Sequence, residues 1–378
     1  MDKRLNRRQV SALIVTAAGV SAAAPHRTFA WQEATPAVGA AGEVFSTGPN
    51  GEAPTAASEV SLTEAELEEI AAMGATAAIV MHYGGNDWSV AQINGLRDQF
   101  GTMGIEVIAE TDAGFDPATQ VSDIETTLAR NPSIIVSIPT DPVATAAAYR
   151  QAAEQGVQIV FMDNVPQGFT QGTDYVSVVS ADNYGNGVAS ANIMADQLGG
   201  AGRIGLVFHG ADFFVTRQRY DAFKATMAES YPEIEIVDEQ GIVGPDFAGD
   251  AERAASAMLT QHADLDGIWA VWDVPAEGVV NAVRANQREG DVIVTTIDLG
   301  LNVAVSIAQD GIVKGLGAQR PFDQGVTEAL LAGYGLLGKE APAYVALPAL
   351  PVTRENVLEA WEQVYHLDPP QALLDAAE

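Results

Sequence analysis

Short apolar runs alternate with segments of helical periodicity from about residue 76 onward, and this alternation constrains the fold most strongly. It is typical of βαβ units that build a parallel sheet. Continuous apolar runs such as Ile134-Ile135-Val136 indicate strands that helices cover on both faces. The strands that we expect are Ala77–His82, Ile105–Glu110, Ile134–Ile138, Gln158–Asp163, Tyr175–Ser180, Ile204–His209, Ile234–Asp238, Gly267–Trp272 and Val292–Asp298. The sequence therefore predicts an α/β fold with doubly wound parallel sheets.

The number and grouping of these strands indicate two lobes. A chain of 378 residues with 47% hydrophobic content is long enough for about two domains. The strands are too many for one compact doubly wound unit, and the pattern restarts near Asp182. We therefore expect two similar lobes with a cleft between them, which is a common location for small-molecule sites.

Polar and aromatic residues gather where several of these strands end. The apolar run from Ala78 leads into a loop with Asn86, Asp87 and Trp88, and the same layout recurs later in the chain. The later examples are Phe161-Met162-Asp163-Asn164, Val271-Trp272-Asp273 and Thr296-Ile297-Asp298. In open α/β sheets, ligands bind outside the carboxyl ends of the strands. Helix N-capping would account for each aspartate taken alone, but together the aspartates favour a binding site.

The residue types at these positions suit the recognition of hydroxyl groups. Carboxylates accept hydrogen bonds from vicinal hydroxyls, arginine donates to oxygen atoms, and amides do both. Aromatic rings cover the apolar C–H face of a sugar. We therefore expect a cleft that binds a small, hydroxyl-rich molecule.

The N-terminus has the features of an export signal. Four basic residues precede an Ala-rich stretch, 10–24, that is too short for a membrane span. We interpret residues 1–30 as a signal peptide, and the Arg7-Arg8 pair favours the twin-arginine route over the general secretory route. Residues 31–58 are rich in Ala, Gly, Pro, Ser and Thr, so we expect a flexible leader there. The sequence thus predicts a periplasmic or otherwise exported protein, soluble after signal removal.

Composition and missing motifs exclude several classes of chemistry. The chain has no cysteine, which excludes disulfides, thiolate metal sites and a lipid anchor on a cysteine. The formal charge of −31 argues against nucleic acid as a partner. The sequence has no phosphate-binding loop, dinucleotide fingerprint, HExxH pair or GxSxG elbow. We therefore expect neither a cofactor nor a metal, and no catalytic machinery is evident.

Seven segments resemble, in order, the sugar-binding branch of the type I periplasmic binding proteins, which are receptors of ABC importers. The resemblance spans about Ala77 to Pro351. The segments are Asn86-Asp87-Trp88-Ser89, Phe161-Met162-Asp163-Asn164, Ser180-Ala181-Asp182-Asn183-Tyr184-Gly185, Arg217 to Phe223, Trp272 to Gly278, Asp298, and Gln319 to Gly325.

The resemblance implies two lobes joined by a hinge of three strands, with crossings near Asp182, Gln319 and Pro348. The N-terminal lobe is then 59–181 plus 320–348, and the C-terminal lobe is 182–319 plus 349–378. Each lobe is therefore discontinuous in sequence.

The resemblance also implies which residues bind the ligand. In the family, the first arginine of the segment that matches residues 217–223 grips the sugar, which assigns this role to Arg217. The residues expected around the ligand are Asn86, Asp87, Trp88, Asp163, Asn164, Phe213, Arg217, Trp272, Asp273, Asp298 and Gln319. Departures from the ribose receptors, such as Trp272 in place of Asn and Asn164 in place of a second arginine, imply a ligand other than ribose. A different sugar, a linear polyol and an autoinducer-like furanose stay open.

The implied function is that of a receptor that captures a sugar or polyol by closing its lobes and delivers it to an ABC permease. We expect a monomer, because two lobes within one chain remove the need for a dimer. One alternative is an exported carbohydrate-active enzyme with Asp163 and Asp298 as paired carboxylates. Another is the effector domain of a transcription regulator, which would need a basic helix-turn-helix where this chain has an export signal.

Overall fold

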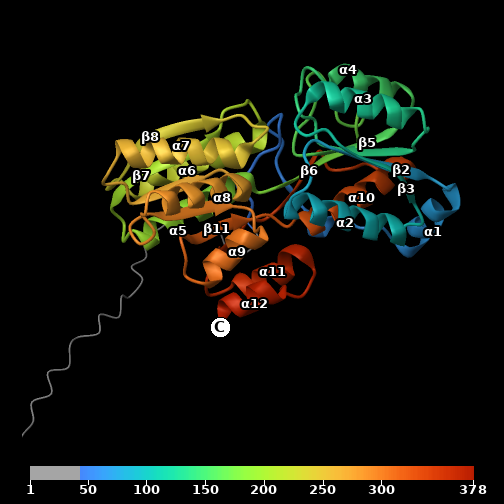
Figure 1. Cartoon of the computed structure of the whole chain (residues 1–378). Helices are drawn as coiled ribbons and strands as arrows, with labels where there is room; N and C mark the ends of the chain where they lie inside the picture. Colours follow the sequence, from blue (N-terminus) through green and yellow to red (C-terminus); the bar gives the residue numbers. More distant parts are fainter. Residues whose placement is uncertain (1–42) are drawn as a thin grey trace, which may run out of the picture. The chain divides into compact units, whose positions relative to one another are not determined.

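The computed structural model describes residues 43–378, which fold around two β-sheets (Figure 1). The expected signal peptide, residues 1–30, and residues 31–42 of the expected leader lie outside the described residues. The first sheet has the strand order β1-β12-β6-β5-β4-β2-β3, and the second has the order β13-β11-β10-β9-β7-β8. Neighbouring strands are parallel except β11 and β13, which are antiparallel. The predicted fold class, two doubly wound parallel sheets, is confirmed.

The first sheet has helices on both faces. Its strands are β1 (Thr55–Ala56), β2 (Thr76–Met81), β3 (Glu106–Asp112), β4 (Ile134–Ser137), β5 (Gln158–Met162), β6 (Ser177–Ala181) and β12 (Tyr344–Leu347). Its helices are η1 (Ala57–Glu59), α1 (Glu64–Met73), α2 (Asp87–Thr102), α3 (Pro117–Leu128), α4 (Ala146–Glu154) and α10 (Pro321–Leu337). Alternate residues of β2 point to opposite faces: Ile79 packs in the cluster that contains Phe100 of α2, and Val80 packs in the cluster that contains Ile124 of α3. Both faces are buried, which explains the continuous apolar run.

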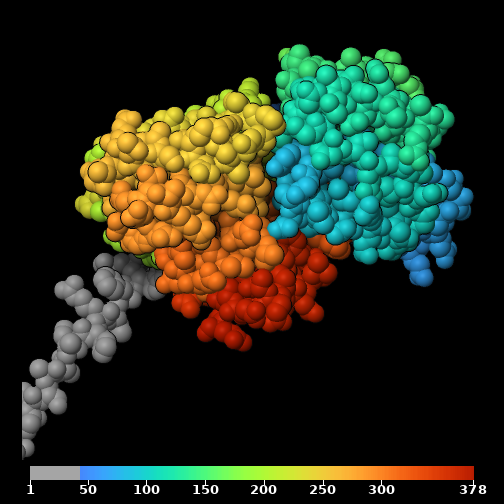
Figure 2. Space-filling view, in the orientation of Figure 1, coloured from blue at the N-terminus to red at the C-terminus, as the bar shows by residue number. Residues whose placement is uncertain are grey.

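The second sheet is built in the same way. Its strands are β7 (Gly202–His209), β8 (Ile234–Ile242), β9 (Gly267–Ala270), β10 (Ile293–Ile297), β11 (Val313–Ala318) and β13 (Leu350–Thr353). Its helices are α5 (Asn183–Gln197), α6 (Phe214–Ser230), α7 (Phe247–Gln261), α8 (Asp273–Ala285), α9 (Leu301–Ala308), α11 (Val357–Tyr365) and α12 (Gln371–Ala377). The last two, red in Figure 2, lie against α9 at the surface. Trp269 fills the core of this sheet, and its indole N–H donates to Ser190 Oγ at 3.0 Å, so no polar atom of the ring is left without a partner.

Between residues 43 and 378, the chain passes from one sheet to the other three times. The first passage joins β6 to α5 at Asp182, the second joins β11 to α10 at Gln319 and Arg320, and the third joins β12 to β13 at Pro348. These are the positions that the family resemblance implies for the three-strand hinge. Each sheet and its helices form one body, and these three connections join the two bodies.

The segment 43–58 differs from the expected flexible leader. Ser46 is only 1% exposed, and its N–H and hydroxyl donate to Asp182 Oδ1 at 2.9 and 2.8 Å. Phe45 N–H donates to Asp182 Oδ2 at 3.0 Å, and β1 pairs with β12 at the edge of the first sheet. The expectation of a flexible leader is wrong for 43–58, because the partner that orders it lies more than a hundred residues away, where composition cannot reveal it.

Four strands, β1, β11, β12 and β13, were not predicted, and β11 shows why. It contains Gly315 and Gly317, which interrupt an apolar pattern that would otherwise indicate a strand. A Cβ at Gly317 would lie 2.6 Å from the Asn186 carbonyl oxygen, and one at Gly315 would lie 2.9 Å from Ile193. The glycines therefore allow α5 to lie directly on the sheet, a reason for a strand glycine that the sequence alone does not disclose.

Candidate functional site

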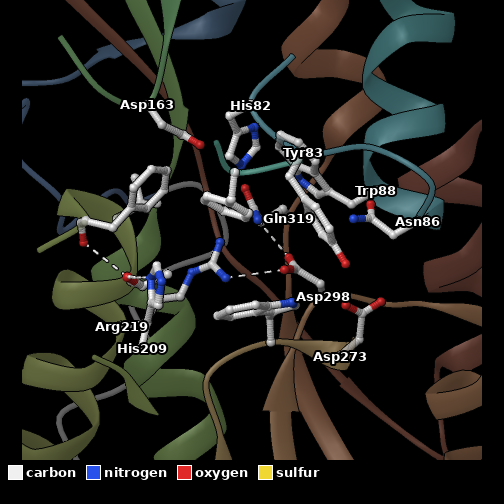
Figure 3. Close-up of a pocket in the computed structure, with 15 residues that line it drawn as sticks. His82, Tyr83, Asn86, Trp88, Asp163, His209, Arg219, Asp273, Asp298 and Gln319 are labelled. Carbon is white, nitrogen blue, oxygen red and sulfur yellow. Dashed lines mark hydrogen bonds and ion pairs between the residues drawn. The ribbon is translucent and has the colours of Figure 1, made fainter. Parts of the chain in front are cut away.

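The carboxyl ends of strands from both sheets line one pocket (Figure 3). Its walls consist of His82, Tyr83, Asn86, Trp88, Phe115, Asp163, His209, Phe213, Val215, Thr216, Arg219, Trp272, Asp273, Asp298 and Gln319. The free volume is about 60 Å³, which is room for only a few water molecules. The pocket lies where open α/β sheets bind ligands, at the ends of the strands and beside the hinge.

Two buried aspartates hold equivalent positions in the two sheets. Asp163 directly follows β5 and has φ 58°, and Asp298 directly follows β10 and has φ 70°. This left-handed conformation is uncommon for residues other than glycine, and aspartate is among those that tolerate it. Ser180 Oγ donates to Asp163 at 2.6 Å, and Gln319 Nε2 donates to Asp298 at 2.7 Å. The turn after each strand thus aims a carboxylate into the pocket.

Arg219 of α6 supplies a positive charge to the pocket. The residue is 4% exposed, and its Nη1 donates to Asp298 Oδ2 and to the Val271 carbonyl oxygen, both at 3.3 Å. Its Nε donates to Asn183 Oδ1 at 2.8 Å. No hydrogen bond within residues 43–378 uses Nη2, which leaves this nitrogen as a donor for a ligand.

Arg217, which was expected to bind the ligand, does not line this pocket. Its side chain is 57% exposed and lies 3.6 Å from Asp212, outside the pocket. Two residues along a helix rotate by about 200°, so Arg217 and Arg219 face opposite sides of α6. The sequence contains a signal for the right choice: Arg219 precedes the buried Phe223 by four residues, a spacing that puts both on one helix face.

Aromatic rings fill much of the space beside these charges. The rings of His82 and Phe213 are stacked, with centroids 5.7 Å apart and planes inclined by 12°. Trp272 meets His209 edge to face at 5.6 Å. Burial lowers the pKa of His82 to about 3, helped by the nearby His209, and lowers the pKa of His209 to about 4, helped by Arg219. Both imidazoles are therefore neutral near pH 7.

The carboxylates respond to burial in the opposite direction. Burial raises the pKa of Asp163 to about 6, although the Ser180 hydroxyl and Arg219 favour the ionised form. Burial, followed by the charge of Asp298, raises the pKa of Asp273 well above its usual range. The carboxylate of Asp273 accepts a hydrogen bond from its neighbour Val274 N–H at 2.9 Å. Burial therefore disfavours the ionised forms of Asp163 and Asp273 in the pocket.

Most of the residues expected around the ligand lie in this pocket, and two besides Arg217 do not. Asn164 is buried but does not line the pocket, and its Nδ2 donates to the Pro139 carbonyl oxygen at 3.3 Å. Asp87 instead accepts a hydrogen bond from Leu301 N–H at 2.7 Å. The pocket contains the expected residues Asn86, Trp88, Asp163, Phe213, Trp272, Asp273, Asp298 and Gln319.

The pocket also contains residues that the sequence analysis did not assign to the ligand. They are His82, Tyr83, Phe115, His209, Val215, Thr216 and Arg219. His82 and His209 end strands β2 and β7, or directly follow them, and this position is the signal that could have identified them. Phe115 has φ 63° in a loop without a recognisable pattern, and nothing in the sequence marks it.

Within residues 43–378, no group of three or more His, Asp or Glu side chains is arranged to hold a metal ion. None of the helices in that part of the chain combines the length and hydropathy of a membrane span.

The fold and the site match one family of proteins. The sequence model of the periplasmic binding protein domain matches residues 77–340, and the chain belongs to this family. Among curated relatives, the ribose import binding protein of Bacillus subtilis is 26% identical over 70% of this chain and 82% of its own length. A putative rhizopine-binding protein of Rhizobium meliloti is 26% identical over 60% of this chain and 76% of its own length.

Solved structures share the architecture. An ABC transporter solute-binding protein from Agrobacterium vitis, bound with α-D-tagatopyranose, has a TM-score of 0.71 at 21% identity and covers 77% of this chain and 99% of its own. A solute-binding protein from Bacillus halodurans with bound myo-inositol has a TM-score of 0.67 at 19% identity and covers 77% of this chain and 98% of its own. At such identities the likeness establishes the fold of this chain.

Proposed function

We propose that this chain is an exported receptor that captures a sugar or polyol in the pocket between its two sheets and delivers it to an ABC permease. The observation that carries the proposal is the convergence of Asp163, Asp298 and Arg219 beside stacked aromatic rings in one buried pocket. A hydroxyl-rich ring or chain binds to hydrogen-bond acceptors, to the several N–H donors of a guanidinium group and to flat apolar faces. The relatives named above, a ribose import binding protein among them, support this assignment.

Binding requires the two bodies to move. A free volume of about 60 Å³ is smaller than a pentose needs, so a ligand enters only when the walls separate. We propose that the lobes 59–181 plus 320–348 and 182–319 plus 349–378 rotate about the three-strand hinge, and that the closed form is the one the permease recognises. The ligand favours closure only by its higher affinity for the closed arrangement.

The pocket is chemically able to provide the affinity of a transport receptor. A buried hydrogen bond to a charged group contributes about 1.5–3 kcal/mol. Several such bonds, after the costs of association and ordering are subtracted, correspond to a dissociation constant of about 1 μM. In this scheme one wall, with Asn86, Trp88 and Asp163, receives the ligand first, and Arg219, Trp272, Asp273 and Asp298 complete the contacts.

The remaining parts of the proposal concern location and assembly. Residues 1–30 act as a signal peptide with the Arg7-Arg8 pair directing twin-arginine export, and the mature receptor works in the periplasm as a monomer. We propose binding without turnover, because the relatives and solved structures named above are described as binding proteins. This disfavours the alternative of a carbohydrate-active enzyme with Asp163 and Asp298 as its acid and base.

A thermal-shift screen of the mature protein tests the proposal. Pentoses, hexoses, inositols and linear polyols at millimolar concentration are added one at a time, and the melting temperature is recorded. A molecule that binds the folded state raises the melting temperature, and the shift grows with its concentration above the dissociation constant. The absence of a shift with every sugar and polyol would contradict the proposal.

Arg219 and Arg217 form a matched pair of variants for the ligand found in that screen. Arg219→Ala should weaken binding by about 10- to 100-fold, because it removes a buried charge-assisted donor. Arg217→Ala, which removes the same side chain two residues away on the solvent side, should leave the affinity unchanged. Calorimetric titration of both variants measures the difference, and equal affinities would show that the ligand binds elsewhere.

A further inference from the structure

The walls of the pocket carry more negative than positive charge. Asp163, Asp273 and Asp298 line it, and Arg219 is the only lysine or arginine among the lining residues. The two histidines add no charge near pH 7, because burial lowers the pKa of each far below that pH. With its carboxylates ionised, the pocket therefore has two negative charges without a partner of opposite sign.

The existing arginine does not reach all three acids. Arg219 is bound to Asp298 and to Asn183, and Asp163 is bound to a hydroxyl. For Asp273, the hydrogen bond recorded within residues 43–378 comes from the backbone of Val274. The charged groups that face Asp273 from the neighbouring elements are Asp298, Glu277 and Asp87, all of which raise its pKa. Asp273 is thus a buried carboxylate that lacks a cation and is surrounded by acids.

Uncharged polar atoms in the pocket also lack partners. Gln319 Oε1, which is an acceptor, Trp88 Nε1, which is a donor, and His82 Nδ1 are buried and have no hydrogen-bond partner among the described residues. The orientation of the Gln319 amide is fixed, because its nitrogen must face the Asp298 carboxylate to which it donates. A hydroxyl group brings one donor and two acceptor sites, whereas an ammonium group brings three donors and no acceptor. The three carboxylates and Gln319 Oε1 offer more acceptor sites than the free N–H groups of Trp88 and Arg219 can fill, and this favours a ligand with more donors than a neutral polyol has.

The rings beside Asp273 suit a cation as well. Tyr83 lies beside this carboxylate in Figure 3, and Trp272, which directly precedes Asp273 in the chain, also lines the pocket. Aromatic faces attract lysine, arginine and ligand cations through their quadrupole, most strongly where water is excluded. A cation in contact with Asp273 would also favour the ionised carboxylate, and would so offset the penalty of its burial.

We propose that the physiological ligand is an amino-substituted sugar or polyol, whose ammonium group binds Asp273 between Tyr83 and Trp272 while its hydroxyls bind Asp163, Asp298 and Arg219. This inference rests on the proposed function and narrows its substrate class. It follows from the charges and acceptors of this chain's own pocket.

Matched pairs of probes test the inference by calorimetric titration. The pairs are D-glucosamine with D-glucose, D-galactosamine with D-galactose, and D-glucamine with D-sorbitol, in which an ammonium replaces one hydroxyl. An added buried ion pair predicts that the amino member of at least one pair binds about tenfold or more tightly than its neutral partner. Raising the salt concentration should leave this preference largely intact, because a buried pair is screened little.

Two variants of helix α8 locate the ammonium group. Asp273→Asn should remove the preference, so that the amino member and the neutral member of a pair bind the variant with similar affinity. Glu277→Gln removes a charge one turn further along the same helix, outside the pocket, and should keep the preference. The melting temperature of each variant verifies that it is folded. A preference that survives Asp273→Asn would overturn the assignment of the ammonium group to this carboxylate.

The outcomes separate this inference from the function on which it rests. If neutral sugars or polyols bind and the amino member is equal or weaker in every pair, the inference is wrong and the proposed receptor function stands. If neither the amino members nor any neutral sugar or polyol binds, both are wrong.

Discussion

Asp163 and Asp298 are not the residues that would make the folded protein most stable at their buried positions. Each is nearly fully buried and has a positive φ, an uncommon conformation for a residue other than glycine, and within residues 43–378 Asp163 also has no cation bonded to it. Such residues persist where the surrounding structure holds them in place for a purpose other than folding. The pocket that they share supplies that purpose, because a ligand with donors compensates the buried carboxylates.

Asp163→Asn should make the unliganded protein more stable near neutral pH. In the folded state burial raises the pKa of Asp163 to about 6, above the value of 3.8 in a free side chain. The folded state therefore holds the proton more tightly, and stability declines as the pH rises from about 4 to about 6 and stays reduced above that range. The penalty that Asn removes above pH 6 is up to about 3 kcal/mol, and Asn also tolerates the positive φ.

Urea unfolding at pH 4 and pH 7.5 measures this effect. The variant should exceed the wild-type protein in stability at pH 7.5 and approach it at pH 4, while its affinity for ligand falls. Asp196→Asn, at an exposed position of α5, should leave stability unchanged at both pH values. A less stable Asp163→Asn protein at pH 7.5 would contradict the account of the buried charge.

Single residues also show where sequence reasoning was sufficient and where it was not. The aspartates after β5, β9 and β10 were predictable, because the end of an apolar strand places the next side chain at the edge of the sheet. The choice between Arg217 and Arg219 depends on which face of α6 is buried, and a match of motifs alone selected Arg217, which lies outside the pocket. Phe115 comes from a loop whose path only the folded chain determines.

At the scale of elements, the helices beside the hinge pack more closely than side chains usually allow. A Cβ at Gly95 of α2 would lie 2.1 Å from the carbonyl oxygen of Phe322 in α10. A Cβ at Gly325 of α10 would lie 2.3 Å from the carbonyl oxygen of Gln92 in α2. The two backbones are therefore in contact, and this contact lies directly after the second passage between the sheets.

Two glycine variants of α2 should change stability in opposite directions. Gly95→Ala forces α2 and α10 apart and should destabilise the protein by about 1–3 kcal/mol or more. Gly101→Ala in the same helix meets no atom within 4 Å and should stabilise it by about 0.5–1 kcal/mol, because alanine has less conformational freedom to lose on folding. Chemical unfolding of both variants measures the difference. Stabilisation by both substitutions would mean that helix propensity, and not the helix contact, determines the result.

Elements with strong periodicity were predictable, and those that depend on distant partners were not. The strands that carry the pocket are continuous apolar runs, and their ends lie within a few residues of the expected positions. Strand β11 contains two glycines because α5 lies on it, and β1 is only two residues long and is held by its pairing with β12. In both cases the cause is a contact between segments far apart in sequence.

At the scale of the whole described chain, contacts outside the pocket also join the two sheets. The ordered segment at the N-terminal end binds Asp182 through Ser46, and Ser46 Oγ accepts a hydrogen bond from Tyr184 N–H at 2.9 Å at the start of α5. The carbonyl oxygen of Thr47 accepts a hydrogen bond from Gln218 of α6 at 3.0 Å, and β1 then joins the first sheet. This segment thus links both bodies in addition to the three strands of the hinge.

Asp87 makes a contact that should exist only when the two bodies are close together. It belongs to α2 of the first sheet, and it accepts a hydrogen bond from Leu301 N–H at 2.7 Å, at the start of α9 beside the second sheet. The N-cap residue of α9 is Gly300, which has no side chain to bind the free N–H groups of the first turn. Asp87 takes the place of that missing cap and adds a negative charge at the positive end of the helix.

Asp87→Ala should therefore weaken ligand binding although Asp87 does not line the pocket. A helix cap contributes about 0.5–2 kcal/mol, and if it forms only in the closed arrangement, its loss shifts the closure equilibrium by that amount. The dissociation constant should rise about 2- to 30-fold, chiefly through faster release, because closure follows the first contact with the ligand.

Stopped-flow tryptophan fluorescence measures the release rate. The control is Asp98→Ala on the same helix, because Asp98 is exposed and has no side-chain bond to the second body. Equal release rates in both variants would mean that the contact is present in the open and closed arrangements alike, and that closure is held by the ligand alone.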